Sequence, residues 1–244
     1  AFEHYKRSLD AFQQAGDERG CATAYNNLGL ASADQQRWEE ADWYYRLALR
    51  AADQIGEVYL RGLALMNRTE VLIAWQRFDE AREDAHVALA IFDNLGAKRH
   101  KSETYRILGV VDRELGALDV AEELLRAAVA LAAEVGATLE EAEALRELAL
   151  LYQELNRNQD ALRTLSEAHR LFRRLDARRD MVDVGAKTAE LEGTYLQVVR
   201  SFNKEGQWRI YPGSPFIAQH LLREEVRDKL KLFELHPTDA RTLD

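Results

Sequence analysis

Residues 22–56 read ATAYNNLGLASADQQRWEEADWYYRLALRAADQIG, and this stretch decides the fold. Apolar residues recur at positions i, i+3, i+4 and i+7 on either side of a short polar turn. This spacing predicts two amphipathic helices that lie antiparallel to each other. Each helix pair has an apolar face that it cannot bury alone, so the pattern predicts that several such pairs stack.

The same pattern returns along the chain with a period of forty residues. Three series of small residues keep this period: Gly16, Gly56, Gly96 and Gly136; Ala41, Ala81, Ala121 and Ala161; and Ala48, Ala88, Ala128 and Ala168. Alanine lets paired helices approach closely, and glycine supplies the left-handed conformation that ends a helix. The period therefore predicts a mainly α solenoid of about four and a half helix pairs over residues 1–187.

Composition argues against several classes of function. The 244 residues carry a net charge of −9, and this acidity argues against the repeats binding nucleic acid phosphates. Cys21 is the only cysteine, so no internal disulfide and no cysteine-based metal site can form. No apolar run approaches the roughly 18 residues that span a bilayer, and no signal peptide is visible. We expect a cytoplasmic protein that binds neither a metal nor a membrane.

The repeated positions resemble the tetratricopeptide repeat in its longer, forty-residue variant. The matching residues of the first full unit are Tyr25, Leu28, Gly29, Trp38, Ala41, Tyr45 and Ala48, and those of the third are Tyr105, Leu108, Gly109, Gly116, Leu118, Ala121, Leu125 and Ala128. Long-repeat members commonly bind peptides or protein segments in a concave groove, so the resemblance implies a protein or peptide partner.

Three positions depart from the repeat pattern. The second unit has Arg68 and Thr69 where Leu-Gly is usual, and the fourth has Asn158 at the aromatic turn position. Ala1 lies forty residues before Ala41, which places the first residue inside a repeat. We therefore expect the repeat domain, residues 1–187, to be truncated at its N-terminus.

Four side chains on the first helices of the pairs are candidate groove contacts. Asn27 and Asn67 hold a position where family members often place an asparagine that hydrogen-bonds a bound peptide backbone. Arg106 and Arg146 lie one position earlier in later units and would face the same groove. Two amides and two guanidinium groups suit an extended or acidic peptide. The alternative is structural: each asparagine caps or bridges neighbouring helices, and each arginine pairs with Glu103, Glu143 or Glu147.

After residue 187 the repeat stops, and all three prolines of the chain follow. The segment YPGSP reads as a tight turn in which Ser214 caps a helix and Pro215 is its first residue. Residues 230–235, LKLFEL, form a short apolar run that suits a buried strand. A helix followed by a buried strand that ends near an acidic residue, Glu234, is half a unit of a nucleotide-binding α/β sheet.

The phrases FNKEGQWRIYPGSPFIAQHLLR and ELHPTDARTL resemble the middle of the bacterial J-type 23S rRNA adenine-N6 methyltransferase. The resemblance covers residues from about 190 to 244 and implies a Rossmann-like fragment in a second domain, residues 188–244. It also implies that Ser214 and Glu234 contact the methyl donor, S-adenosylmethionine. The alternative is that Ser214 only caps a helix and Glu234 is a solvated strand end.

The sequence lacks other motifs of that family, namely its glycine-rich DTHAGAG-type loop, its N-terminal histidine contacts and a DPPY-type motif. We therefore expect a peptide-binding scaffold fused to an incomplete enzyme that has no catalytic residues and is inactive as given. A second hypothesis is a complete rRNA methyltransferase whose gene continues into the missing motifs, and only that enzyme would use S-adenosylmethionine and rRNA. A third is that the tail occupies the groove of its own repeats.

Overall fold

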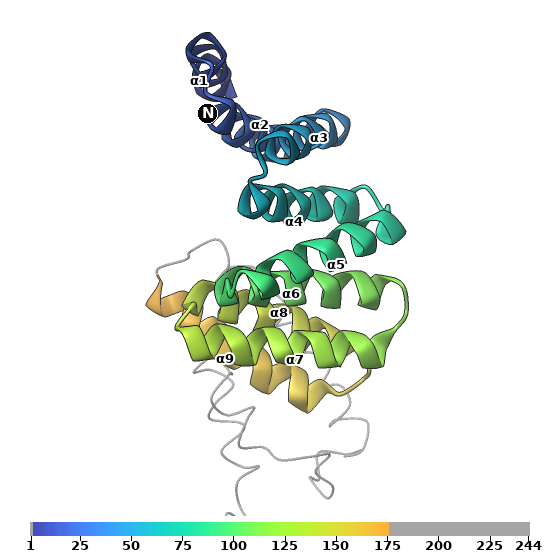
Figure 1. Cartoon of the computed structure of the whole chain (residues 1–244). Helices are drawn as coiled ribbons and strands as arrows, with labels where there is room; N and C mark the ends of the chain where they lie inside the picture. Colours follow the sequence, from blue (N-terminus) through green and yellow to red (C-terminus); the bar gives the residue numbers. More distant parts are fainter. Residues whose placement is uncertain (1, 176–244) are drawn as a thin grey trace, which may run out of the picture. The chain divides into compact units, whose positions relative to one another are not determined.

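The computed structural model describes residues 2–175, and every regular element in that range is an α-helix (Figure 1). The helices are α1 (Phe2–Ala15), α2 (Glu18–Ala33), α3 (Trp38–Ile55), α4 (Val58–Ala74), α5 (Phe78–Asn94), α6 (Lys98–Glu114), α7 (Leu118–Val135), α8 (Thr138–Glu154) and α9 (Asn158–Arg174). Within the described range these nine helices confirm the prediction of four and a half helix pairs. The α/β fragment predicted after residue 187 lies outside the described residues.

The chain divides into two compact units, Ala1–Ala137 and Thr138–Asp244. The first unit contains α1 and the pairs α2/α3, α4/α5 and α6/α7, and the second contains the pair α8/α9. The domain boundary predicted at residues 187 and 188 stays a prediction, because the structure does not describe the residues around it.

Small residues bring the two helices of a pair together, as the repeat pattern predicts. Gly29 on α2 lies under the ring of Tyr45 on α3, and a Cβ atom at Gly29 would come 2.6 Å from Tyr45 Cε1. Gly109 on α6 lies equally close to Leu125 on α7, at 2.6 Å from its Cγ atom. Tyr45 and Leu125 are fully buried. These two pairs therefore each bury one large side chain against a glycine, which is the tight packing that protein interiors require.

Residues with a left-handed backbone conformation occur in two places, in the connections between helix pairs and in the turns within them. Gly16, Gly56, Gly96 and Gly136 follow α1, α3, α5 and α7 with φ between 62° and 69°, which confirms these predicted helix ends. A second series lies in the turn within each pair, where φ is 57° at Gln36, 60° at Gln76, 79° at Gly116 and 58° at Asn156. These four positions also keep the forty-residue period, although three of them are not glycine. The tight turn therefore imposes the left-handed conformation even on Gln36 and Gln76, which do not prefer it, whereas asparagine tolerates it more readily.

Candidate functional site

Asn67 lies on α4 and reaches the neighbouring first helix α2. Its Nδ2 atom donates a hydrogen bond to Oδ1 of Asn26 over 3.0 Å, and both side chains are half-buried. This contact corresponds to the structural alternative, in which an asparagine bridges neighbouring helices. It also leaves the outer hydrogen-bonding capacity of an amide available, since a carboxamide has two donor hydrogens and two acceptor lone pairs.

Asn27 holds the equivalent position on α2 and is also half-buried. Among the residues that the structure describes, no hydrogen-bond partner of its side chain is present. A half-buried amide without a protein partner can exchange hydrogen bonds with water or with a ligand backbone. Asn27 is therefore the candidate contact whose side-chain amide has the most hydrogen-bonding capacity left for a ligand.

Arg106 on α6 pairs with Glu70 on α4. The distance from Arg106 Nη2 to Glu70 Oε1 is 2.9 Å, and the arginine side chain is only 12% exposed. The pair links the first helices of two successive helix pairs, as the Asn67–Asn26 bond does for α2 and α4. We call the surface formed by α2, α4 and α6, with Asn26, Asn27, Asn67, Glu70 and Arg106 on it, the first-helix face.

Arg146 lies on α8, in the second unit. Its Nε atom lies 3.2 Å from Oε1 of Glu147, which is one of the partners that the structural alternative expects. The structure therefore brings Asn67 and Arg106 onto one face with Asn27, and Arg146 belongs to the second unit.

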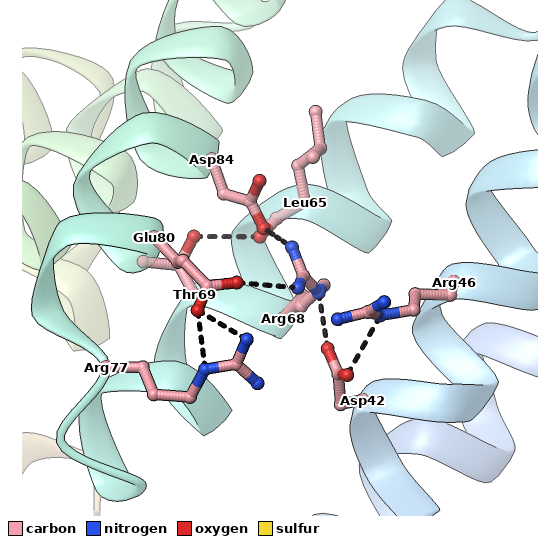
Figure 2. Close-up of polar contacts among 8 residues, drawn as sticks. All are labelled: Asp42, Arg46, Leu65, Arg68, Thr69, Arg77, Glu80 and Asp84. Carbon is pink, nitrogen blue, oxygen red and sulfur yellow. Dashed lines mark hydrogen bonds and ion pairs between the residues drawn. The ribbon is translucent and has the colours of Figure 1, made fainter. Parts of the chain in front are cut away.

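Arg68 on α4 is a buried arginine of the first unit, 8% exposed, and it contacts carboxylates on both sides (Figure 2). Its Nε atom donates to Asp42 Oδ1 on α3 over 2.5 Å, and Nη1 donates to Oδ2 of Asp84 on α5. Its Nη2 atom also lies 3.7 Å from Oε2 of Glu80. One guanidinium thus joins the second helices of two successive pairs.

Two further arginines neutralise the carboxylates around Arg68. Arg46 Nε lies 2.9 Å from Asp42 Oδ2, and Arg77 Nε donates to Glu80 Oε1 over 2.6 Å. Figure 2 shows these contacts converging from α3, α4 and α5. We call the six residues Asp42, Arg46, Arg68, Arg77, Glu80 and Asp84 the Arg68 cluster; its three cations balance its three carboxylates.

Burial and charge act in opposite directions on the centre of the Arg68 cluster. Burial alone lowers the pKa of the Arg68 guanidinium, but the hydrogen bonds and charges of Asp42 and Asp84 outweigh it, so the pKa is raised. Burial raises the pKa of the Asp84 carboxyl, and the charges of Asp42 and Glu80 add to this, whereas Arg68 lowers it. The net shift for Asp84 is upward, so it is easier to protonate than an ordinary aspartate.

Sequence reasoning noticed Arg68 only as a departure from the repeat and assigned it no contact. The signal that could have found the cluster is positional. Arg68 stands in the register of Leu28, Leu108 and Leu148, which are core residues, so a buried charge there requires buried partners. Asp42 and Asp84 also hold registers that carry apolar residues elsewhere, Leu162 and Leu124 respectively.

Ser214 and Glu234, the predicted contacts of S-adenosylmethionine, lie outside the described residues. In the part of the chain that the structure describes, no group of three or more histidine, cysteine, aspartate or glutamate side chains could hold a metal ion. Within the same range, none of the helices combines the length and the apolar character needed to cross a membrane.

The repeated helices are similar to those of known helical-repeat proteins. Residues 101–174 match the family described as Tetratricopeptide repeat. The chain is similar to BtubC (BKLC) from P. vanneervenii, with a TM-score of 0.64 and 16% identity, over 87% of this chain and 95% of that one. It is also similar to a signal transduction ATPase with a tetratricopeptide repeat sensor from Pyrococcus horikoshii, with a TM-score of 0.63 and 17% identity, over 98% of this chain and 38% of that one. Residues 101–174 therefore match tetratricopeptide repeats, and the described helix pairs share the fold of these solved structures.

The C-terminal part of the chain matches a particular enzyme family. Residues 153–244 match the family described as Ribosomal RNA large subunit methyltransferase D, RlmJ. Over 51 residues the chain is 61% identical to Ribosomal RNA large subunit methyltransferase J of Escherichia coli (strain K12), which is 21% of this chain and 17% of that enzyme. The chain thus contains one segment that matches tetratricopeptide repeats and one that matches the RlmJ family, and it spans less than a fifth of the length of this curated relative.

Proposed function

We propose that the repeats are a scaffold whose first-helix face binds an extended protein or peptide segment. The observation that carries the proposal is the placement of the half-buried amides of Asn27 and Asn67 at equivalent positions on successive first helices. An extended backbone presents one donor and one acceptor per residue, and spaced carboxamides can pair with both.

The charges on the first-helix face suit a ligand that carries a carboxylate. Arg106 is held by Glu70, which is 47% exposed and so lies at the solvent edge of the face. A carboxylate of a bound peptide would compete with Glu70 for the guanidinium, because the Glu70 side chain can turn away into solvent. The proposed ligand is therefore an extended segment with an acidic side chain or terminus beside the Arg106 position.

The test is a selection of peptides by the whole chain. Random twelve-residue peptides displayed on phage are selected on the immobilised protein, and the affinities of the recovered peptides are measured by fluorescence anisotropy. Loss of one well-aligned hydrogen bond weakens binding about five- to tenfold, so we expect that loss for Asn27→Ala and for Asn67→Ala. Asn94→Ala is the matched control, because Asn94 is exposed on the second helix α5. Equal affinity of all four proteins for every selected peptide would remove the first-helix face as the binding site.

A second candidate function rests on the 61% identity to the E. coli rRNA methyltransferase. We propose for it that Ser214 and Glu234 hold S-adenosylmethionine in an enzyme that acts on an adenine of ribosomal RNA. The acidic residue would accept hydrogen bonds from the ribose hydroxyls of the methyl donor. Both candidates suit a cytoplasmic protein.

Calorimetric titration of S-adenosylmethionine into the chain separates the two candidates. From the motifs that the sequence lacks, we expect no measurable heat. Heat that Ser214→Ala and Glu234→Ala each remove would instead assign donor binding to these residues and favour the methyltransferase.

A further inference from the structure

One position of the helix pairs carries opposite charges in successive pairs. Asp42 on α3 and Arg82 on α5 are forty residues apart and so hold the same place in their second helices. Each reaches the first helix of the following pair. Asp42 Oδ1 accepts from Arg68 Nε on α4 over 2.5 Å, and Arg82 Nε lies 3.0 Å from Asp112 Oδ1 on α6.

Both junctions bury charge. The side chains of Asp42 and Arg68 are 9% and 10% exposed; at the second junction Asp112 is 1% exposed, whereas its partner Arg82 is 45% exposed. A buried charge without its partner is strongly unfavourable, whereas a buried pair is of little net value compared with well-packed apolar residues. The two pairs therefore add little to the stability of the native arrangement. Their main effect is to destabilise any arrangement in which the partners are separated.

The repeat register shows what a wrong arrangement would bring together. In the place that Arg68 takes on α4, α6 has Leu108, and in the place that Asp112 takes on α6, α4 has Leu72. If α3 packed on α6, Asp42 would lose Arg68 and meet Asp112, so two carboxylates would be buried together.

The opposite mistake is also unfavourable, although less so, because Arg82 is 45% exposed. If α5 of one copy packed on α4 of another, Arg82 would lose Asp112 and meet Arg68, so two guanidinium groups would face each other. Leucine, by contrast, is compatible with every pairing, and a solenoid of similar repeats with apolar junctions has no such discrimination.

We propose that the Asp42–Arg68 and Arg82–Asp112 pairs specify the order in which the helix pairs of the first unit stack. The two junctions use charges of opposite sign at the same position, so each accepts only its own neighbour. This role is independent of what the first-helix face binds.

The test replaces the charges at the first junction with residues that the chain itself uses in the same registers. These are Leu162 for Asp42, Leu108 for Arg68 and Leu124 for Asp84, so the variant is Asp42→Leu, Arg68→Leu, Asp84→Leu. Spin labels at Arg50→Cys and Ala90→Cys, in a Cys21→Ala background, report the distance between α3 and α5. Arg50 and Ala90 are exposed and equivalent in the two helices.

We expect one narrow distance distribution for the chain with native junctions. The leucine variant should keep its helical content and unfold at the same or a higher temperature. It should also show a second or much broader distance population, with oligomers that increase with protein concentration in light scattering. A monomeric leucine variant with the same single narrow distance would overturn the proposal.

The second junction provides a comparison if the leucine variant does not fold. Arg82→Leu and Arg82→Asp both remove the pair with Asp112, but only Arg82→Asp places a like charge beside it. We expect the midpoint of thermal unfolding to fall several degrees further for Arg82→Asp, and Asp112→Leu to recover that difference. Equal midpoints for Arg82→Leu and Arg82→Asp would overturn the proposed discrimination by charge.

Discussion

Replacing Arg68 by leucine tests the energetics of the Arg68 cluster directly. Arg68→Leu removes the one cation that contacts both Asp42 and Asp84, and it leaves two largely buried carboxylates at the junction. Removing one partner of a buried pair costs about 3–5 kcal/mol. Arg46 still pairs with Asp42, so we expect a value near the lower end, about 3 kcal/mol. For a unit of this size that corresponds to a fall of about 10 °C in the unfolding midpoint.

The pH dependence of this cost identifies its cause. Burial raises the pKa of Asp84 above its ordinary value even with Arg68 present, and loss of the cation removes the only effect that lowers it. A carboxyl whose pKa is raised in the folded state costs stability when ionised and stops doing so once protonated. The destabilisation by Arg68→Leu should therefore be largest at neutral pH and shrink as the pH falls towards the pKa of an unfolded aspartate, about 3.9.

Circular dichroism at 222 nm during thermal unfolding, repeated between pH 7 and pH 4, measures both quantities. Arg46→Leu is the matched control, because Arg46 belongs to the same cluster but is 49% exposed. It should cost no more than about 1 kcal/mol, with little change over that pH range. The reasoning is refuted if Arg68→Leu costs no more than Arg46→Leu, or if its cost is the same at pH 4 and pH 7.

Three other side chains give independent checks. Gly29→Ala should destabilise the chain by about 1–3 kcal/mol in urea unfolding, because the added methyl group would overlap the buried ring of Tyr45; a neutral result would contradict the packing. Burial and two nearby carboxylates raise the pKa of Cys21, so its reaction with a disulfide reagent at pH 8 should be slower in the native than in the urea-unfolded chain, and equal rates would contradict this. Burial and a neighbouring arginine lower the pKa of His169, so its ring should titrate below 6.5 by NMR, and stability should fall as the pH drops from 6.5 through that lower pKa; His169→Asn should remove this pH dependence.

The repeat architecture could be predicted because its signals are local and repeated. The glycines that end the second helices appear four times at one spacing, and each has the left-handed conformation that this position requires. The turns within the pairs gave no such signal, because Gln36, Gln76 and Asn156 occupy the left-handed region without being glycine. At the two glutamines the conformation follows from the closure of a short connection between two packed helices, whereas asparagine itself tolerates the left-handed region.

The contacts of the candidate site join residues of different repeats, so they depend on how neighbouring repeats pack. Asn67 could be placed on a first helix from the period, but its bond to Asn26 depends on how α4 lies beside α2. The same holds for Arg68, whose partners come from the helix before it and the helix after it in the chain. Periodicity therefore identifies which side chains share a face, whereas pairing between repeats requires the packed structure.

The opposite charges at Asp42 and Arg82 have a consequence for the history of the array. Copies of a duplicated repeat start identical, so their junctions start interchangeable. Once a buried charge appears on one side of a junction, the residue across it must change as well, and neither can revert alone. Residues at these junctions should therefore diverge in coupled pairs, and recombination that moves one helix pair without its neighbour should yield chains that fold poorly.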